Sequence, residues 1–505
     1  MSIGRRLGAL GACFCAAGVA AFSAVPARAE TLADALALAY QTNPVLQGQR
    51  ATQRALDETY VQARSGYNPT ASVQGTVTTD SNNETFSTSV GSIPGQSQTS
   101  TATLTVTQPI YTGGLVSSEV NAANADVLAG REQLRQVEES VLQAVITAYV
   151  DVRRDQESLA IAQENVTVLK RQQDEAKARF DVGEITRTDV AQTDARLAAA
   201  QAQLSTAQAQ LTISRAAYAE VVGQNPADLA PEPPLERLMP ATVDQAFDAA
   251  EHNNPQIRQA DYAEQGAAAR VAEAKAQTRP TVALRGSAGY QGGNLGVASP
   301  FANYTHDLNA TAVVTFPLFT GGLTSSEIRQ AAERDNVARI AVENVRRLVL
   351  QQVAQDWSQL LGARANLVAN QEQVRATSIA FEGTRQEAQV GLRTTLDVLN
   401  AEQELRNAEL ALVNARHDEY VAASAVLAAM GSLFVSDLTS GVPNYDPKTN
   451  FDHVRHAIGW MPWTPAVEAI DRIGAPSIIQ APPASAPIGA ASATPSPALR
   501  GRQDF

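Results

Sequence analysis

The stretch VTQPIYTGGLVSSEV, residues 106–120, recurs as VTFPLFTGGLTSSEI at residues 314–328. Each copy reads as a threonine-rich strand, a proline, an aromatic residue, two glycines and then a run that contains neither glycine nor proline. Measured between the prolines at positions 109 and 317, the copies lie 317 − 109 = 208 residues apart. Repetition at a fixed distance predicts two copies of one structural unit.

The repetition runs through nearly the whole chain. NPVLQGQ at Asn43 recurs as NPQIRQA at Asn254, a distance of 254 − 43 = 211 residues, whereas from Thr107 onward the distance is 208. The first copy therefore contains three more residues upstream of Thr107. These distances predict a first structural repeat over residues 30–235 and a second over residues 236–435.

Two segments of each repeat alternate between apolar and polar residues. The apolar positions are Ala71, Val73, Gly75, Val77, Leu104, Val106 and Ile110 in the first repeat, and Val282, Leu284, Ala312, Val314, Phe316 and Leu318 in the second. Alternation over about ten residues is typical of a membrane-barrel strand, apolar toward lipid and polar toward the lumen. A half-buried strand of a soluble protein alternates in the same way. Polar loops beginning at Asp80 and Gly292 are expected to join each pair of strands.

A helical pattern of unusual length follows each pair of glycines. The two patterns cover residues 116–180 and 324–389, and about 65 residues of helix span about 100 Å. Returning helices are expected over residues 188–222 and 395–429, and each repeat should open with a helix that an Asn-Pro pair interrupts. The returning helices carry small and apolar residues at spacings of three and four, as in coiled coils, and the second departs from this seam only at Glu419.

The N-terminus and the charge indicate an exported, acidic protein. Arg5 and Arg6, an apolar run and small residues before Glu30 predict a signal peptide over residues 1–29. It carries three arginines and no acid, so its removal changes the net charge from −13 to −13 − 3 = −16, which argues against a nucleic-acid partner. Both cysteines of the chain, Cys13 and Cys15, lie in it. No later stretch approaches about 18 consecutive apolar residues, so no transmembrane helix is expected.

The strand count predicts an assembly of several chains. Four strands cannot close a barrel in lipid, because an open sheet edge leaves backbone groups unpaired. Membrane barrels have about eight strands or more, so at least two chains must share one sheet, and a trimer would have 3 × 4 = 12 strands. The expected fold class is therefore a mixed α and β membrane protein, with four strands per chain in a transmembrane β-barrel that several chains share.

The order of elements carries a family resemblance. With QPIYTGG and FPLFTGG at the joints, rod-length helices, and VGEITRTDV and VGLRTTLDVLNA at the hairpin turns, residues 31–433 resemble the TolC-like outer-membrane efflux proteins. The resemblance implies a homotrimer in the outer membrane of a Gram-negative bacterium, with a large periplasmic portion. It also implies that a trimeric 12-stranded transmembrane β-barrel continues into a long periplasmic α-helical coiled-coil barrel. It also implies a periplasmic adaptor (membrane fusion) protein and an inner-membrane transporter of the RND or ABC type as partners. The cargo it implies is drugs, other small molecules or secreted proteins, as in type I secretion.

The resemblance assigns a lock to the hairpin turns. In the family, an arginine of the second repeat and a Thr-Asp pair of the first hold the periplasmic entrance closed. Carried over to this sequence, the arginine is Arg393 and its partners are Thr188 and Asp189. A guanidinium group binds a carboxylate through two directional hydrogen bonds, which competing contacts can break. Ala388 replaces a tyrosine of the family pattern, which implies a lock that is weaker or differently built.

The resemblance also implies a ring of acidic residues that selects cations at the entrance. Its first position corresponds to Asp397, and its second, an aspartate in the family pattern, is Asn400 here. Both repeats place an aspartate six residues after a glycine, at Asp189 and Asp397, which favours a functional role. The alternative interpretation is a solvated charge at a helix turn.

The joints themselves consist of Pro109, Gly113 and Gly114 in the first repeat and Pro317, Gly321 and Gly322 in the second. A proline suits the change from strand to helix, where no ladder donor is required. Tyr111 and Phe319 are candidates for an aromatic girdle at the membrane interface, and equally for packing at a strand end.

No motif of an enzyme, a cofactor site or a metal site is recognised. The five histidines are scattered, and although His453 and His456 have the spacing of metal ligands, they lack cysteines and an acidic partner. Residues 436–470 form a C-terminal segment that could pack around the waist of the tunnel, and residues 471–505 a Pro/Ala-rich disordered tail. Two other functions remain open: a general diffusion porin, which would not need rods of about 100 Å, and a soluble periplasmic coiled-coil scaffold, which would not need the strands.

Overall fold

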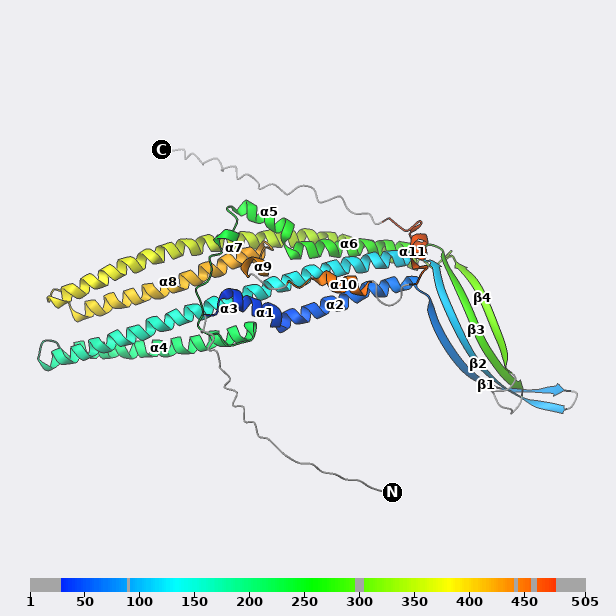
Figure 1. Ribbon diagram of the computed structural model, residues 1–505, viewed down its shortest axis with the longest axis horizontal. Coiled ribbons are helices and arrows are strands. Elements are labelled where there is room, and N and C mark those ends of the chain that lie inside the picture. Colours follow the sequence, from blue (N-terminus) through cyan, green and yellow to red (C-terminus); the bar gives the residue numbers. More distant parts are fainter. Residues whose placement is uncertain (1–28, 89–90, 296–303, 440–443, 456–460, 478–505) are drawn as a thin grey trace, which may run out of the picture.

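The protein is elongated, with a four-stranded sheet at one end and the tips of two helical hairpins at the other (Figure 1). This computed structural model describes residues 29–88, 91–295, 304–439, 444–455 and 461–477. The expected signal peptide, except for its last residue, and residues 478–505 of the expected tail lie outside the described residues.

The two repeats contain the same main elements in the same order. The first consists of α1 (Leu32–Thr42), α2 (Pro44–Arg64), the 3-10 helix η1 (Ser65–Tyr67), β1 (Thr70–Thr88), β2 (Gly91–Tyr111), α3 (Leu115–Asp181) and α4 (Arg187–Val222). After η2 (Glu236–Leu238), the second consists of α5 (Val243–Asn253), α6 (Pro255–Ala276), β3 (Thr281–Leu295), β4 (Thr305–Thr315), α7 (Leu323–Gln389) and α8 (Thr395–Ala429). The C-terminal segment contains α9 (Val435–Leu438), α10 (Pro447–Val454) and α11 (Thr464–Arg472). The predicted rods, returning helices and four strands are confirmed.

Each Asn-Pro pair is both a helix boundary and an anchor. Asn43 ends α1 and caps α2 through a hydrogen bond from the main chain of Val45 to its side chain. Its amide nitrogen also donates to the carbonyl oxygen of Val221 near the end of α4, at 2.9 Å. Asn254 makes the corresponding contact with Ala429 at the end of α8, at 2.8 Å. The break therefore ties the opening helices of each repeat to its returning helix.

The sheet has one apolar and one polar face, as the alternation predicts. Its antiparallel order is β1-β2-β3-β4, so β1 and β4 are the edges. The register aligns the apolar positions across the strands: Val73 pairs with Leu104, Val106 with Gly286, and Leu284 with Ala312. Exposed members of this face include Val73, Val77, Leu104, Leu284, Leu308 and Val314. A face of this kind requires an apolar environment.

The prediction of a polar loop that begins at Asp80 is wrong. β1 continues to Thr88 and β2 begins at Gly91, with a register shift between Ser81 and Thr85. The ladder is made by main-chain groups, so a run of polar side chains does not oppose pairing. Most of the second expected loop, residues 296–303, lies outside the described residues.

The helical core lies midway along the rods, where α1, α3, α4, α7 and α8 meet. Its largest fully buried side chains include Tyr149, Tyr218, Leu142, Ile146 and Leu427. Between positions 201 and 218 of α4, the residues that are not exposed are Leu204, Ala207, Leu211, Ser214 and Tyr218, which are the predicted seam. Where α8 departs from the seam, Glu419 pairs with Arg364 of α7 at 3.3 Å. Among the helices of the described residues, none combines the length and apolar character needed to cross a bilayer.

The C-terminal segment, which follows the second repeat, packs against the first. α10 lies along α2, and α11 contacts β2, η1 and α3 where the sheet meets the helices (Figure 1). Phe451 of α10 lies over the guanidinium group of Arg131 and packs edge-on against Tyr60, with the ring centres 5.0 Å apart. α11 ends at Arg472, two residues into the segment expected as a tail.

Candidate functional site

The two Thr-Gly-Gly turns are joints between strand and helix, as the repeated stretch predicts. β2 ends at Tyr111 and α3 begins at Leu115, while β4 ends at Thr315 and α7 begins at Leu323. All four glycines of the joints have a positive φ: Gly113 73°, Gly114 86°, Gly321 63° and Gly322 88°. Only glycine adopts this conformation freely, so both joints require the pair.

The first joint is enclosed by the C-terminal segment. A Cβ added to Gly114 would lie 2.9 Å from the Cα of Ala475. The fully buried carboxylate of Asp471 in α11 accepts hydrogen bonds from the main-chain nitrogen of Thr112 (2.6 Å), the hydroxyl of Thr112 (2.8 Å) and the main-chain nitrogen of Gly114 (3.3 Å). These nitrogens precede the first turn of α3, whose dipole also favours a negative charge. Sequence reasoning missed Asp471, and no local pattern marks it.

The second joint is open in the single chain. Among the described residues, no atom lies within 4 Å of a Cβ added to either of its glycines. Phe319 is 90% exposed, whereas Tyr111 at the equivalent position is half-buried. The prolines also differ, because Pro109 lies within β2 just before a register shift and Pro317 lies beyond the end of β4.

The turns at the helical tips are closed by matching capping boxes. Asp189 accepts from the main-chain nitrogen of Thr186 at 2.9 Å, and the hydroxyl of Thr186 accepts from the main-chain nitrogen of Asp189 at 3.3 Å. Asp397 and Thr394 repeat this pair at 3.0 and 3.2 Å. The main-chain hydrogen bond lowers the pKa of each carboxyl group. Thr-x-x-Asp is a recognisable capping signal, and it accounts for an aspartate six residues after the glycine in both repeats.

The arginine expected in the lock has a partner in its own turn. Nε of Arg393 donates to Glu387 at 2.8 Å, and this contact raises the pKa of Arg393. Thr188 is exposed at the tip of the other hairpin, beside Asp189. Within the described residues of one chain, neither Thr188 nor Asp189 forms an ion pair or hydrogen bond with Arg393.

Polar contacts join α8 to the hairpin of the first repeat. Asn400, the expected second ring position, accepts a hydrogen bond from Arg196 of α4 at 2.9 Å. Further contacts of this kind are Gln172 to Glu402 at 2.6 Å, Arg406 to Glu164 at 3.5 Å, and His417 to Asp151 at 2.9 Å. Burial alone would lower the pKa of His417, but hydrogen bonds to Asp151 and Asp418 outweigh it and raise the pKa. The two hairpins are therefore joined by polar contacts together with a small apolar cluster, in which Leu399 of α8 packs with Leu169 of α3 and Leu197 of α4.

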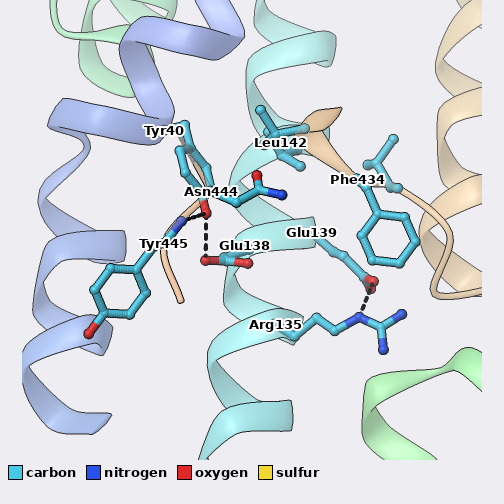
Figure 2. A pocket seen from close by; sticks show the side chains of 10 residues that line it. Tyr40, Arg135, Glu138, Glu139, Leu142, Phe434, Asn444 and Tyr445 are labelled. Carbon is cyan, nitrogen blue, oxygen red and sulfur yellow. Dashed lines mark hydrogen bonds and ion pairs between the residues drawn. The ribbon is translucent and has the colours of Figure 1, made fainter. Parts of the chain in front are cut away.

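A small polar pocket of about 120 Å³ lies between α1, α3 and the C-terminal segment (Figure 2). The hydroxyl of Tyr40 donates to Glu138 at 3.2 Å and accepts from the main chain of Tyr445 at 3.1 Å. Glu139 points toward Arg135, whose Nε lies 3.6 Å from its carboxylate (Figure 2). Burial raises the pKa of Glu139 to about 8, although Arg135 opposes this shift.

Metal-ligating residues do not gather anywhere in the described part of the chain: no group of three or more His, Cys, Asp or Glu is placed to hold an ion. Of the two histidines with metal-like spacing, His453 lies on α10, and His456 is outside the described residues.

Comparisons with known proteins match both repeats. The profile of the family described as outer membrane efflux protein matches residues 35–224 and 246–432. Outer membrane efflux protein BepC of Brucella suis is 35% identical over 438 residues, which cover 85% of this chain and 91% of BepC. Alkaline protease secretion protein AprF of Pseudomonas aeruginosa is 27% identical over 351 residues, which cover 68% of this chain and 72% of AprF. Among solved structures, the outer membrane protein VceC of Vibrio cholerae superimposes with a TM-score of 0.66 at 23% identity, covering 79% of this chain and 96% of VceC.

Proposed function

The chain belongs to the outer membrane efflux protein family, and on that premise we propose that three copies of it build one exit duct. As a member of this family, the protein is an export channel of the outer membrane with a large periplasmic helical part. The observation that carries the proposal of a trimer is the sheet, which has an exposed apolar face and two edges, β1 and β4. An unpaired edge in lipid costs several kcal/mol for each group, and 3 × 4 = 12 strands remove all edges by closing a barrel.

The long helices continue the barrel as a periplasmic tunnel. Each chain supplies two joints, so a trimer has 3 × 2 = 6 points at which strands pass into helices of 67 residues, each about 100 Å long. A duct of this length reaches toward the inner membrane, where a periplasmic adaptor and a transporter of the RND or ABC type would deliver cargo. We assign no catalytic activity to the chain, because the transporter would supply the energy that drives export.

The cargo class we propose is small molecules, secreted proteins or both. BepC is named an efflux protein and AprF a protease secretion protein, and these two names support the two kinds of cargo. A deletion strain, profiled for drug sensitivity and for proteins in the medium, tests which kind is exported. Sensitivity without a change in secreted proteins would restrict the duct to small molecules.

The periplasmic entrance is closed at the tips by Arg393, Thr188 and Asp189. In the single chain Arg393 is held by Glu387, and closure exchanges this contact for the Thr-Asp pair of the other hairpin. Asp397 forms the cation ring, and Asn400 adds a neutral position that Arg196 holds in place. All these side chains lie at one end of the molecule, which is consistent with one gate.

Fractionation with heat-modifiable gel mobility tests the duct. We expect the protein in the outer membrane as a species of about three chains that heating converts to a single chain. Recovery as a soluble monomer would contradict the barrel and favour the periplasmic scaffold. A pore that is fully open, and unaffected by any change at the tips, would favour the porin.

Single-channel conductance in planar bilayers tests the gate. Arg393→Ala combined with Asp189→Asn should raise the conductance, because the ion pair is lost while the amide oxygen of asparagine can still accept a hydrogen bond from the main chain of Thr186. Glu387→Ala is the matched control, since it removes only the partner of Arg393 within its own turn. Equal conductance of the double variant and the unmodified protein would remove the lock from the proposal.

A further inference from the structure

The last described helix, α11, is fixed to the protein by one face. The hydroxyl of Thr464 donates to the side chain of Asn68 at 3.2 Å, and Asp471 binds the first joint. Between them, Val467 packs on Tyr67 in a small buried cluster. These three contacts follow the spacing 464, 467, 471, so they hold one complete stripe of the helix inward.

A second stripe of α11 is apolar, and its residues are exposed in the described part of the chain. It consists of Ala466 and Ile470 of the helix with the flanking residues Trp463 and Ile473, at spacings of three, four and three. Trp463 is 47% exposed, Ile470 41% and Ile473 71%. The charged residues of the helix lie away from this stripe: Glu468 is paired with Arg64 at 2.8 Å, and Arg472 is exposed at the end of the helix. α11 therefore exposes an apolar stripe, whereas a surface helix in water turns its apolar stripe inward and exposes polar residues.

The position of α11 marks the level at which the sheet ends. It lies where β2 passes into α3 (Figure 1). The indole nitrogen of Trp463 donates to Gln108 at 2.9 Å, and Gln108 pairs with Leu284 in the register that aligns the apolar positions. The stripe therefore continues the apolar face of the sheet toward the helices.

We propose that this stripe of α11 is seated in the headgroup and acyl-chain boundary of the periplasmic leaflet of the outer membrane. A short helix with an apolar stripe and flanking charges is suited to lie in the plane of such an interface. Tryptophan is the residue favoured there, with its ring in the boundary and its N–H paired. Arg472, exposed at the end of the helix, offers a cation to lipid phosphate.

A phospholipid surface fits the stripe better than a second copy of the chain does. A neighbouring copy would join the sheet at the edges β1 and β4, whereas the sheet strand that α11 contacts is β2, an inner one. The continuity of the stripe with the apolar face also points to the medium that bathes that face. This inference rests on the proposed barrel, and the experiment below separates failure of the two.

Spin labels on the full chain in phosphatidylethanolamine and phosphatidylglycerol vesicles test the inference. Single cysteines at Ile470→Cys and Ile473→Cys are labelled in a background in which Cys13 and Cys15 are serine. Collision with oxygen reports contact with lipid, and collision with a water-soluble nickel chelate reports contact with water. Val73→Cys, on the exposed apolar face of β1, is the lipid control, and Lys448→Cys, exposed on α10 of the same segment, is the water control.

The expected result is a ratio of oxygen to nickel collisions at both α11 positions that matches Val73→Cys and exceeds Lys448→Cys several-fold. A ratio like that of Lys448→Cys would overturn the inference. Low collision with both reagents would overturn it too, because it would show that a neighbouring copy covers the stripe. If Val73→Cys itself reports water, the barrel fails; if it reports lipid and the α11 labels do not, the barrel stands and the interfacial helix is rejected.

Discussion

The two joints have similar local sequences and the same left-handed pair of glycines, yet their surroundings differ. Gly114 is enclosed by Ala475 and held by Asp471, whereas Gly322, at nearly the same φ, has no atom near the site of a Cβ. The difference comes from the C-terminal segment, which follows the second repeat but covers the first. Repeated sequence therefore determines the shape of a turn, and the rest of the chain determines what the turn packs against.

The two rods, α3 and α7, also differ in their surroundings, and the charges at their equivalent positions are reversed. At a distance of 208 residues, Arg135, Glu138 and Glu139 of α3 correspond to Glu343, Arg346 and Arg347 of α7. The α3 set lines the pocket under the C-terminal segment, with Glu139 only 7% exposed in its side chain, whereas Arg347 is 70% exposed. The same backbone position thus holds a buried acid in one repeat and a solvated base in the other.

The largest expected effect is at Asp471. Asp471→Ala should destabilise the protein by about 3 kcal/mol, because buried donors at Thr112 and Gly114 lose a charged acceptor. The melting temperature followed by circular dichroism measures the loss. Asp452→Ala, an exposed acid of the same segment, is the control and should change little. Equal losses for the two variants would show that α11 does not hold the first joint.

The next effect compares the joints directly. Gly114→Ala and Gly322→Ala both force a side chain into left-handed backbone, at about 1–2 kcal/mol each. Gly114→Ala adds a contact of 2.9 Å with the main chain of Ala475, so it should cost about 1–3 kcal/mol more. Matching melting temperatures for the two variants would mean that the second joint is equally enclosed in the assembled protein.

Features that depend on neighbouring residues could be predicted from the sequence. The four strands, the rods, the Asn-Pro breaks and both joints follow from alternation, periodicity, proline and glycine, each of which acts within a few residues. Thr186 and Asp189 form a capping box that was also readable, although Asp189 was interpreted as part of a gate or as a solvated charge at a helix turn. The polar run after Asp80 was interpreted as a loop because side-chain polarity does not report main-chain pairing.

The asymmetry of the repeats could not be predicted in this way. Asp471 is the first residue of a segment expected as a tail, and its partners Thr112 and Gly114 lie more than 350 residues earlier (471 − 114 = 357). Nothing in the local sequence of α11 specifies that it returns to the first repeat. The long-range contact is set by the packing of its inward stripe, of which Val467 is the centre, onto Tyr67 and Val116 of the folded first repeat.

The buried carboxyl group of Glu139 predicts a pH dependence of stability, which the exposed Arg347 at the equivalent position of α7 does not. The unfolded chain releases the proton of a glutamic acid near pH 4.3, whereas the folded chain holds that of Glu139 to about pH 8. The folded state therefore loses stability as pH rises between these values, and the loss is complete above pH 8. At pH 9, Glu139→Gln should raise the free energy of unfolding by about 1–2 kcal/mol, and so raise the melting temperature above that of the unmodified protein. Near pH 5 the two melting temperatures should match.

A matched control for this pH dependence is Glu343→Gln, which removes an acid from the equivalent turn of α7. Because Glu343 is solvated on one side, its replacement should leave the slope of melting temperature against pH unchanged. A slope that is as steep in Glu139→Gln as in the unmodified protein would assign the dependence to other buried acids, of which Glu138 lies in the same pocket.

The smallest expected effect is the ion pair on the exposed rod. Arg347 lies 2.9 Å from Glu343, one turn of α7 away, and both side chains are largely in water. A double-mutant cycle with Arg347→Gln and Glu343→Gln should give a coupling energy of about 0.3–0.5 kcal/mol, since solvent screens the pair. The same cycle on Arg135 and Glu139 should give a larger value, because water is excluded there. A coupling above about 2 kcal/mol on α7 would mean that the second repeat is covered in the assembled protein, by another molecule rather than by its own C-terminal segment.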